Sequence, residues 1–313
     1  MVGSKKPWKA WLYLSPAIVL LLIFTVWPII NTVRMAFLEG YNALAVAGGK
    51  KFEFGFANFV NVIEYRDFVT CLKNTVLLCV LTVPISTFLA LVISVCLNAI
   101  KPFRRMLQTI FFLPYVTNSI AIGMVFAAMF NMVGRNIGGK NELILTAGII
   151  NNVIEFFGGQ AINWINKGSS EWANMTVMVI YIVWNALPFK ILVLLGGLQS
   201  VNKQYYDAAK IDGTSRLRTF TRITVPLLSP MITYVVITGF IGGFKEYSSI
   251  VGIFGEKMGP SSNPYRLDTM VGFIYRDLAN QQGRASAAAL ILFGIIFVVT
   301  MLNLYISKKN THY

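Results

Sequence analysis

Six long apolar runs, separated by polar segments, limit what this chain of 313 residues can fold into. An α-helix rises about 1.5 Å per residue, so about 20 apolar residues are enough to cross the hydrocarbon core of a membrane. Only 13% of the residues are charged, against roughly a quarter in soluble proteins, which predicts an all-α membrane protein with six transmembrane helices. The predicted spans are Trp11–Val33, Asn74–Ala99, Leu107–Met132, Trp172–Leu198, Thr224–Phe244 and Ala285–Ser307.

Three details refine this pattern of spans. No small-residue cleavage site of a signal peptide follows the first apolar run, so that run is predicted to stay as the first span. Pro114 interrupts the third predicted span. In the second long loop, Glu142–Phe157 carries apolar residues at helical spacing and is predicted to form a helix at the membrane interface.

The distribution of lysine and arginine predicts the orientation of the chain. The two tails and the loops Ile100–Met106 and Gln199–Ile223 hold 13 Lys and Arg within about 50 residues. The three long loops also hold 13, spread over about 120 residues and mixed with 11 acidic residues. Because cation-dense short loops stay in the cytoplasm, both termini are predicted to be cytoplasmic. The predicted organisation is a tail 1–10, a transmembrane domain 11–307 and a tail 308–313.

Several classes of function are disfavoured by what the sequence lacks. No phosphate-binding Gly-x-x-x-x-Gly-Lys-Ser/Thr loop occurs, so ATP hydrolysis is expected on a partner chain. His312 is the only histidine and the three cysteines have no zinc spacing, so no catalytic or metal site is predicted. The spans contain no Asp or Glu, which argues against a secondary transporter and leaves a channel subunit as an alternative. The net charge of +14 lies mostly in loops and indicates topology rather than nucleic-acid binding.

A cation-rich segment between the fourth and fifth spans, Tyr205–Pro230, predicts two short helices joined by a sharp turn. Helical spacing favours Tyr205–Ile211 and Thr214–Ile223 as the helices. Gly213 is the predicted turn, since glycine adopts a left-handed conformation without a Cβ penalty. This arrangement is typical of a segment that docks on another protein, and an arginine-rich cytoplasmic loop without a partner is an equal alternative.

The same segment carries a resemblance to a known family. The matching residues are Asp207-Ala208-Ala209, Asp212-Gly213, Phe220, Ile223, Pro226 and Pro230. Their order and spacing resemble the signature loop of ABC-importer permeases, which implies the type I ABC-importer permease fold with coupling helices over 204–223. Asp207 stands where that family usually has Glu, and Thr214 where it usually has Ala. On this resemblance the residues that contact a cytoplasmic ATPase are Tyr206, Asp207, Ala208, Ala209, Asp212, Gly213 and Phe220.

Motifs along nearly the whole chain narrow the resemblance to carbohydrate permeases of the maltose and glycerol-phosphate type. These motifs are Leu12–Ala17, Asn74-Thr75, Phe103–Arg105, Phe112–Tyr115, Leu194–Ser200 and Gln282–Ala285. The resemblance implies a bacterial cytoplasmic-membrane complex with a homologous second permease, two ATPases and an extracellular sugar-binding protein. It implies no cofactor in this chain, with ATP and Mg on the ATPases. Glycerol-phosphate or another polar solute is the alternative substrate.

Sugar recognition needs flat apolar faces for stacking and hydroxyl or amide groups for hydrogen bonds. Tyr115 and Ser119 match substrate contacts of related oligosaccharide permeases residue for residue, whereas Asn185 and Glu246 match only by neighbourhood. Core packing is the alternative for each of them. Lys190 either lines the cavity or extends towards the cytoplasmic surface. The predicted substrate pathway consists of Tyr115, Ser119, Asn185, Phe189, Phe244, Glu246 and Tyr247.

Overall fold

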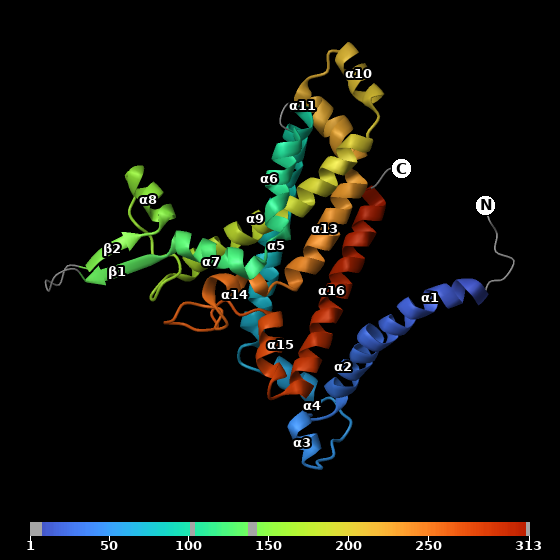
Figure 1. Ribbon diagram of the computed structural model, residues 1–313, viewed down its shortest axis with the longest axis vertical. Coiled ribbons are helices and arrows are strands. Elements are labelled where there is room, and N and C mark those ends of the chain that lie inside the picture. Colours follow the sequence, from blue (N-terminus) through green and yellow to red (C-terminus); the bar gives the residue numbers. More distant parts are fainter. Residues whose placement is uncertain (1–7, 101–103, 137–142, 311–313) are drawn as a thin grey trace. The chain divides into compact units, whose positions relative to one another are not determined.

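The computed structural model describes residues 8–100, 104–136 and 143–310, which form helices joined by loops and one β-hairpin (Figure 1). The predicted all-α fold is confirmed. Parts of four predictions lie outside these residues: 1–7 and 311–313 of the two tails, Phe103 of a quoted motif, and Glu142 of the interface helix. The described residues divide into two compact units, one from the parts 1–68 and 273–293 and the other from the parts 69–272 and 294–313.

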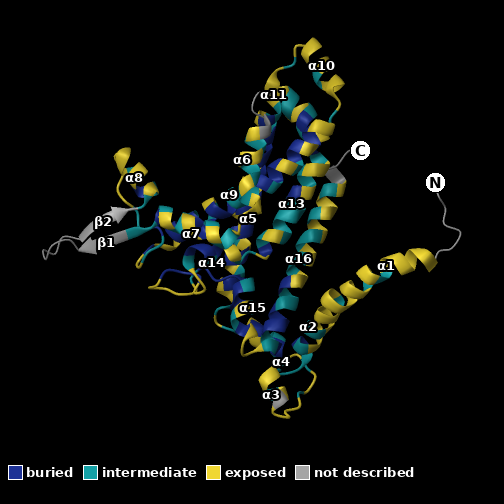
Figure 2. Ribbon diagram, in the orientation of Figure 1, coloured by how far each residue is buried: buried dark blue, intermediate teal, exposed yellow. Residues whose placement is uncertain are grey.

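In the first unit, the N-terminal span is longer than predicted and runs without interruption from Trp8 to Phe37. It consists of α1 (Trp8–Leu21), a π-helical turn η1 (Leu22–Val26) and α2 (Trp27–Phe37). None of its most apolar 18 residues is buried, and Figure 2 shows α1 almost entirely exposed. In a membrane this surface faces lipid or another chain, because exposed apolar residues on such a scale mark an interface.

The rest of the first unit is organised by Asn58, which is buried at the start of α4 (Ala57–Ile63). Its amide nitrogen donates to the carbonyls of Ala36 and Leu38 at 3.0 and 2.7 Å, and its oxygen accepts from the N–H of Gly40. A single side chain therefore holds the sharp exit from α2. A short helix α3 (Ala43–Ala47) lies between α2 and α4 in the chain.

A second anchor of the first unit lies at the start of α16 (Gln282–Asn310). Two guanidinium nitrogens of Arg284 contact both carboxylate oxygens of Asp277, at 2.5 and 2.9 Å. Asp277 belongs to α15 (Met270–Leu278), and the guanidinium also lies 4.4 Å from the centre of the Tyr65 ring. This bidentate pair is the kind of ion pair that fixes geometry as well as adding energy.

The second unit is built on two long helices, α5 (Phe68–Ala99) and α9 (Glu171–Ser200). Leucine side chains from both helices, with Ala90 of α5 and Ile191 of α9, share a buried cluster with Leu228 and Val235. These last two belong to the segment around α13 (Ser229–Phe244). Ser170 caps the start of α9, because its hydroxyl accepts from the N–H of Ala173.

The third predicted span is broken between Val116 and Ser119, not at Pro114 as the sequence indicates. α6 (Arg104–Val116) continues past the proline, and α7 (Ser119–Phe130) leaves it at an angle of 100°. Asn118 makes the break possible, because its side-chain oxygen accepts from the N–H groups of Ile120 and Ala121 and so begins a new helix. α7 is therefore not the second half of a straight span.

After the break, α7 packs closely on α14 (Ser248–Phe254). A Cβ atom on Gly123 of α7 would lie 2.7 Å from the Cα atom of Gly252 on α14. Only glycine allows two helices to approach to this distance. The pair places the beginnings of α7 and α14 beside the pocket described below.

The second long loop differs from its prediction. Leu143–Ala147 is not helical but forms strand β2, antiparallel to β1 (Met132–Asn136), with Met132 opposite Ala147 and Asn136 opposite Leu143. A helix α8 follows at Ile149–Phe156, so the prediction holds only for the second half of Glu142–Phe157. Leu143–Ala147 contains isoleucine and threonine, which favour strands, and the helical spacing of its apolar residues was misleading.

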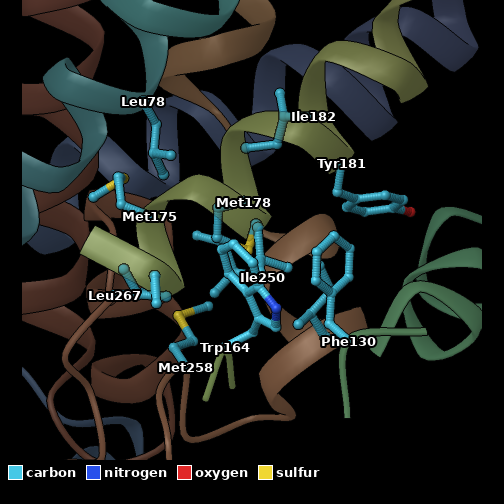
Figure 3. Close-up of a cluster of buried hydrophobic side chains, with 13 residues drawn as sticks. Leu78, Phe130, Trp164, Met175, Met178, Tyr181, Ile182, Ile250, Met258 and Leu267 are labelled. Atoms are coloured by element: carbon cyan, nitrogen blue, oxygen red, sulfur yellow. The ribbon is translucent and has the colours of Figure 1, made fainter. Parts of the chain in front are cut away.

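The core of the second unit lies where α5, α7, α9 and α14 meet (Figure 3). Tyr181 and Met178 of α9 are fully buried there, beside Ile250 of α14 and Phe130 of α7. Asn174 is also fully buried, and its amide donates to the Trp164 carbonyl at 2.6 Å. The loop that precedes α9 is thus fastened to this helix by a buried polar side chain whose amide is hydrogen-bonded, as burial requires.

The segment between the fourth and fifth predicted spans has the expected two helices. They are α10 (Lys203–Ile211) and α11 (Arg216–Thr219), the second extended by a π-helical turn η2 (Phe220–Thr224) and by α12 (Val225–Leu227). Gly213 has a φ of 64°, as predicted for the turn. Arg216–Leu227 and α13 meet at an angle of 68°.

Within the described ranges, four helices are long and apolar enough to cross a membrane, and six spans result if each bent pair counts as one. The four are Trp8–Phe37, Phe68–Ala99, Glu171–Ser200 and Gln282–Lys308. The bent pairs take the places of the third and fifth predicted spans. Six spans are therefore reached only with two of them broken.

Candidate functional site: a polar pocket among the broken helices

A pocket of about 420 Å³ opens in the second unit, between α5, the α6–α7 break, α9 and α13. This volume falls within the range of roughly 300–1,000 Å³ typical of small-molecule sites. Five of the seven predicted pathway residues line it. The lining consists of Thr82, Val83, Ser86, Tyr115, Thr117, Ser119, Ile182, Asn185, Ala186, Phe189, Lys190, Thr238, Gly239, Gly242, Gly243 and Glu246.

Aromatic rings form one wall of the pocket. The rings of Tyr115 on α6 and Phe189 on α9 are stacked, with centroids 5.8 Å apart and planes at 20°. Two rings outside the lining flank them: Phe112 lies 5.4 Å from Tyr115, and Tyr234 lies 6.4 Å from Phe189. This wall offers the flat apolar surface on which a sugar ring can stack.

A chain of hydrogen bonds forms the polar side at the α6–α7 break. The Asn185 amide donates to the Ser119 hydroxyl at 3.3 Å, and that hydroxyl lies 3.1 Å from the hydroxyl of Tyr181. Tyr181 also donates to the carbonyl oxygen of Ser119. The first residue of α7 is thereby attached to α9.

Glu246 lies where α13 has ended and α14 begins. Its side-chain oxygen Oε1 accepts from the backbone N–H groups of Tyr247 and Ser249, both at 3.1 Å. The hydroxyl of Thr269 donates to the Glu246 carbonyl at 2.9 Å. A carboxylate just before a helix is stabilised by the free N–H groups at the helix N-terminus, so Glu246 both lines the pocket and fixes the start of α14.

The structure places the remaining two predicted pathway residues outside the lining. Phe244 is buried, with 4% of its surface exposed. Tyr247 packs against the core cluster around Tyr181 and Ile250. Both residues therefore pack in the core, which is the alternative to a pathway role that the sequence left open.

Lys190 lines the pocket and does not extend towards the cytoplasmic surface. Only 4% of the residue is exposed, and its Nζ donates to Ser86 Oγ, Thr87 Oγ1 and the Val83 carbonyl at 2.7, 2.9 and 3.2 Å. Gly239 makes room for it, because a Cβ there would lie 3.1 Å from Nζ. None of the ion pairs among the described residues includes Lys190.

Sequence reasoning predicted Ser119 but missed the hydroxyl groups that α5 and α13 contribute to the pocket. Thr82 and Ser86 on α5 and Thr238 on α13 line it. All three also donate within their own helix, to a carbonyl three or four residues earlier. Serine and threonine do this in most membrane helices, so the sequence offers no signal that separates pocket hydroxyls from others.

The predicted coupling residues divide into an exposed and an inward set. Asp207 is exposed and lies 3.5 Å from Lys210. Two neighbouring apolar residues that were not predicted, Ile211 and Leu217, are 86% and 73% exposed. Ala209 is buried, and Phe220 packs against the core cluster of α5 and α9. An exposed apolar pair on two short helices is a surface without a partner in the described chain.

Comparison with known proteins defines the class of this chain. Residues 75–312 match the family model described as the binding-protein-dependent transport system inner membrane component. The chain belongs to this family and is a multi-pass transport subunit of the inner membrane.

Three similar transport proteins match nearly the whole chain. The arabinooligosaccharides transport system permease protein AraP of Bacillus subtilis is 29% identical over 308 residues, 97% of this chain and 90% of that protein. The lactose transport system permease protein LacF of Rhizobium radiobacter is 28% identical over 296 residues, 94% of this chain and 91% of that protein. The trehalose/maltose permease protein MalF of Thermococcus litoralis is 25% identical over 298 residues, 95% and 93% of the two chains.

A solved structure confirms the fold. A chain of a bacterial ABC transporter involved in the import of the acidic polysaccharide alginate has a TM-score of 0.76 to this one. The two are 21% identical, with 97% of this chain and 96% of that chain covered. The type I ABC-importer permease fold predicted from the sequence is therefore confirmed.

Proposed function

We propose that this chain is the permease subunit of an ABC importer that moves a carbohydrate, in particular an oligosaccharide, across the cytoplasmic membrane. Alternating access, driven by ATP hydrolysis on a partner chain, would carry the sugar through the pocket. The observation that carries the proposal is the pocket itself, whose lining combines the stacked rings of Tyr115 and Phe189 with hydroxyl and amide groups. The saccharides in the names of the three relatives support the same substrate class.

The polar lining favours an uncharged or weakly charged solute with many hydroxyl groups. Thr82, Ser86, Ser119 and Asn185 can each exchange hydrogen bonds with a hydroxylated ligand. Glycerol phosphate is the second candidate, since Lys190 adds a positive charge to the pocket lining. The aromatic wall favours the saccharide, because a glycerol chain has no ring to stack.

We infer that three kinds of partner complete the importer: a homologous second permease, two ATPases and an extracellular sugar-binding protein. The exposed apolar side chains of Ile211 on α10 and Leu217 on α11 support an ATPase partner at this surface. A structure similar to this chain is that of an alginate ABC transporter in complex with a periplasmic protein that holds an alginate pentasaccharide. The density of lysine and arginine supports a cytoplasmic position for this surface and for both termini.

The proposal is tested with the importer reconstituted in proteoliposomes from both permeases, the ATPase and the binding protein. ATP-dependent uptake is measured for radiolabelled oligosaccharides and for glycerol phosphate. We expect uptake of an oligosaccharide that depends on all four components. Uptake of glycerol phosphate alone, or uptake that persists without the ATPase, would contradict the proposal.

A further inference from the structure

Tyr181 lies outside the pocket, yet its hydroxyl reaches a residue that lines it. Its ring is fully buried and packs on Phe126 with centroids 4.8 Å apart. Figure 3 shows the ring at the edge of the core cluster, with its oxygen pointing away from the other labelled side chains. That oxygen meets both the carbonyl and the hydroxyl of Ser119.

The direction of each hydrogen bond in this group follows from the chemistry of the atoms. A carbonyl oxygen only accepts, so the single phenolic proton of Tyr181 goes to the Ser119 carbonyl. The contact of 3.1 Å between the two hydroxyls then requires Ser119 to donate its own proton to Tyr181. With that proton committed, Ser119 accepts from the Asn185 amide at 3.3 Å.

We propose that Tyr181 is a positioning residue that makes Ser119 a hydrogen-bond acceptor towards the ligand. The Ser119 hydroxyl has no proton left for the pocket and can offer only a lone pair. The same chain of bonds fixes the Asn185 amide, with one of its N–H groups directed to Ser119. Beside Ser119, the pocket therefore selects a ligand hydroxyl that donates a hydrogen bond. The inference rests on the proposed function, because it states how the pocket recognises a hydroxyl group of a saccharide.

The test compares a parent oligosaccharide with its deoxyfluoro analogues, in each of which fluorine replaces one hydroxyl. Fluorine accepts a hydrogen bond weakly and cannot donate one. Uptake by the reconstituted importer is measured with the binding protein saturated by each sugar, so that differences report on the permease. At one hydroxyl position we expect the wild-type importer to take up the analogue about three- to tenfold less well than the parent, the size of one lost hydrogen bond.

Tyr181→Phe removes the phenolic oxygen and keeps the ring that packs on Phe126. The Ser119 hydroxyl can then turn its proton into the pocket, so the discrimination is expected to shrink to about twofold or less. A variant that only loosened the fold would slow both sugars alike and leave their ratio unchanged. Tyr305→Phe, a similar change on the exposed face of α16, is expected to keep the wild-type ratio.

Two results would overturn the inference. One is wild-type uptake of every deoxyfluoro analogue at the parent rate, a measurement that needs no variant to fold. The other is an unchanged ratio in Tyr181→Phe. Failure of the proposed function looks different, because the parent sugar itself would then not be transported.

Discussion

The ammonium of Lys190 lies 2.7 Å from the hydroxyl oxygen of Ser86, and this contact ties α9 to α5 inside the membrane-spanning part of the chain. Two further acceptors on α5, Thr87 Oγ1 and the Val83 carbonyl, complete the set of three that an ammonium group can use. A lysine at the centre of a membrane helix costs about 2.5–3.5 kcal/mol on insertion scales. The three hydrogen bonds offset part of this cost.

The contact predicts an unequal effect of removing its two partners. Ser86→Ala leaves a buried ammonium N–H without an acceptor and should lower the free energy of unfolding by about 1–3 kcal/mol. Lys190→Met keeps the length of the side chain and removes the charge, while Ser86 and Thr87 keep their bonds to carbonyls of α5. We therefore expect it to leave stability unchanged or to raise it. Thermal unfolding of the purified complex measures both, with Thr176→Ala as the control, since the Thr176 hydroxyl donates to the Trp172 carbonyl of its own helix. A larger loss in Lys190→Met than in Ser86→Ala would contradict this account.

The close approach of α7 and α14 gives a second prediction. Gly123→Ala would place a Cβ 2.7 Å from the Gly252 Cα, so the two helices must separate. Overpacking of this kind should cost about 1–3 kcal/mol of stability. Gly196→Ala is the matched control, because it also lies within a helix and has no atom within 4 Å of its would-be Cβ. It should be neutral or stabilise, and equal unfolding temperatures for the two variants would argue against the packing.

Much of the fold follows from composition, and the parts that do not are set by local side-chain contacts. The order of the apolar helices could be predicted, since each run is long enough to span a membrane. The break after Val116 could not, because Pro114 is the obvious signal and the cap that begins α7 is Asn118. For Leu143–Ala147, the spacing of the apolar residues predicted a helix, whereas its β-branched residues favour a strand. The segment forms a strand.

The candidate site shows the same division. Tyr115, Ser119, Asn185, Phe189 and Glu246 line one pocket, and their contact with a sugar stays a prediction. The direction of Lys190 could not be foreseen, because a long side chain goes where neighbouring helices offer acceptors, and those lie about 100 residues earlier in the chain. Tyr181 was missed because a tyrosine on an apolar helix is expected to pack in the core. Its ring does pack there, while its hydroxyl bonds to Ser119.

The turn at Gly213 predicts how transport is coupled to ATP hydrolysis. Proline fixes φ near about −65° and lacks an N–H, whereas Gly213 has a φ of 64° and donates to the Lys210 carbonyl. Gly213→Pro should therefore displace α10 from α11 and abolish stimulation of the ATPase by the loaded binding protein. Gly49→Pro makes the same change at a residue with φ of 83° in a long loop, and should keep stimulation. Stimulation at the wild-type level in Gly213→Pro would exclude a docking role for this turn.

The orientation of the chain predicts which loops react from outside the cell. In a background without Cys71, Cys79 and Cys96, a cysteine is introduced at Ser215, before α11, or at Ser261, in the loop after α14. Membrane-impermeant maleimide should label the Ser261 variant in intact cells and the Ser215 variant only after lysis. Labelling of the Ser215 variant in intact cells would reverse the orientation and remove the argument for an ATPase at α10 and α11.

The most direct test of the central claim, that the pocket carries a sugar, is uptake by Tyr115→Ala. Tyr234→Ala is the matched control, because both tyrosines lie beside Phe189 and are about half exposed, but only Tyr115 lines the pocket. Loss of the stacking surface should cost on the order of 1 kcal/mol beyond the buried area, or about a fivefold or larger loss of uptake. Radiolabelled oligosaccharide uptake, normalised to the amount of assembled complex, is predicted to fall in Tyr115→Ala and to persist in Tyr234→Ala. Uptake by Tyr115→Ala at the wild-type rate would contradict the assignment of this pocket to the sugar.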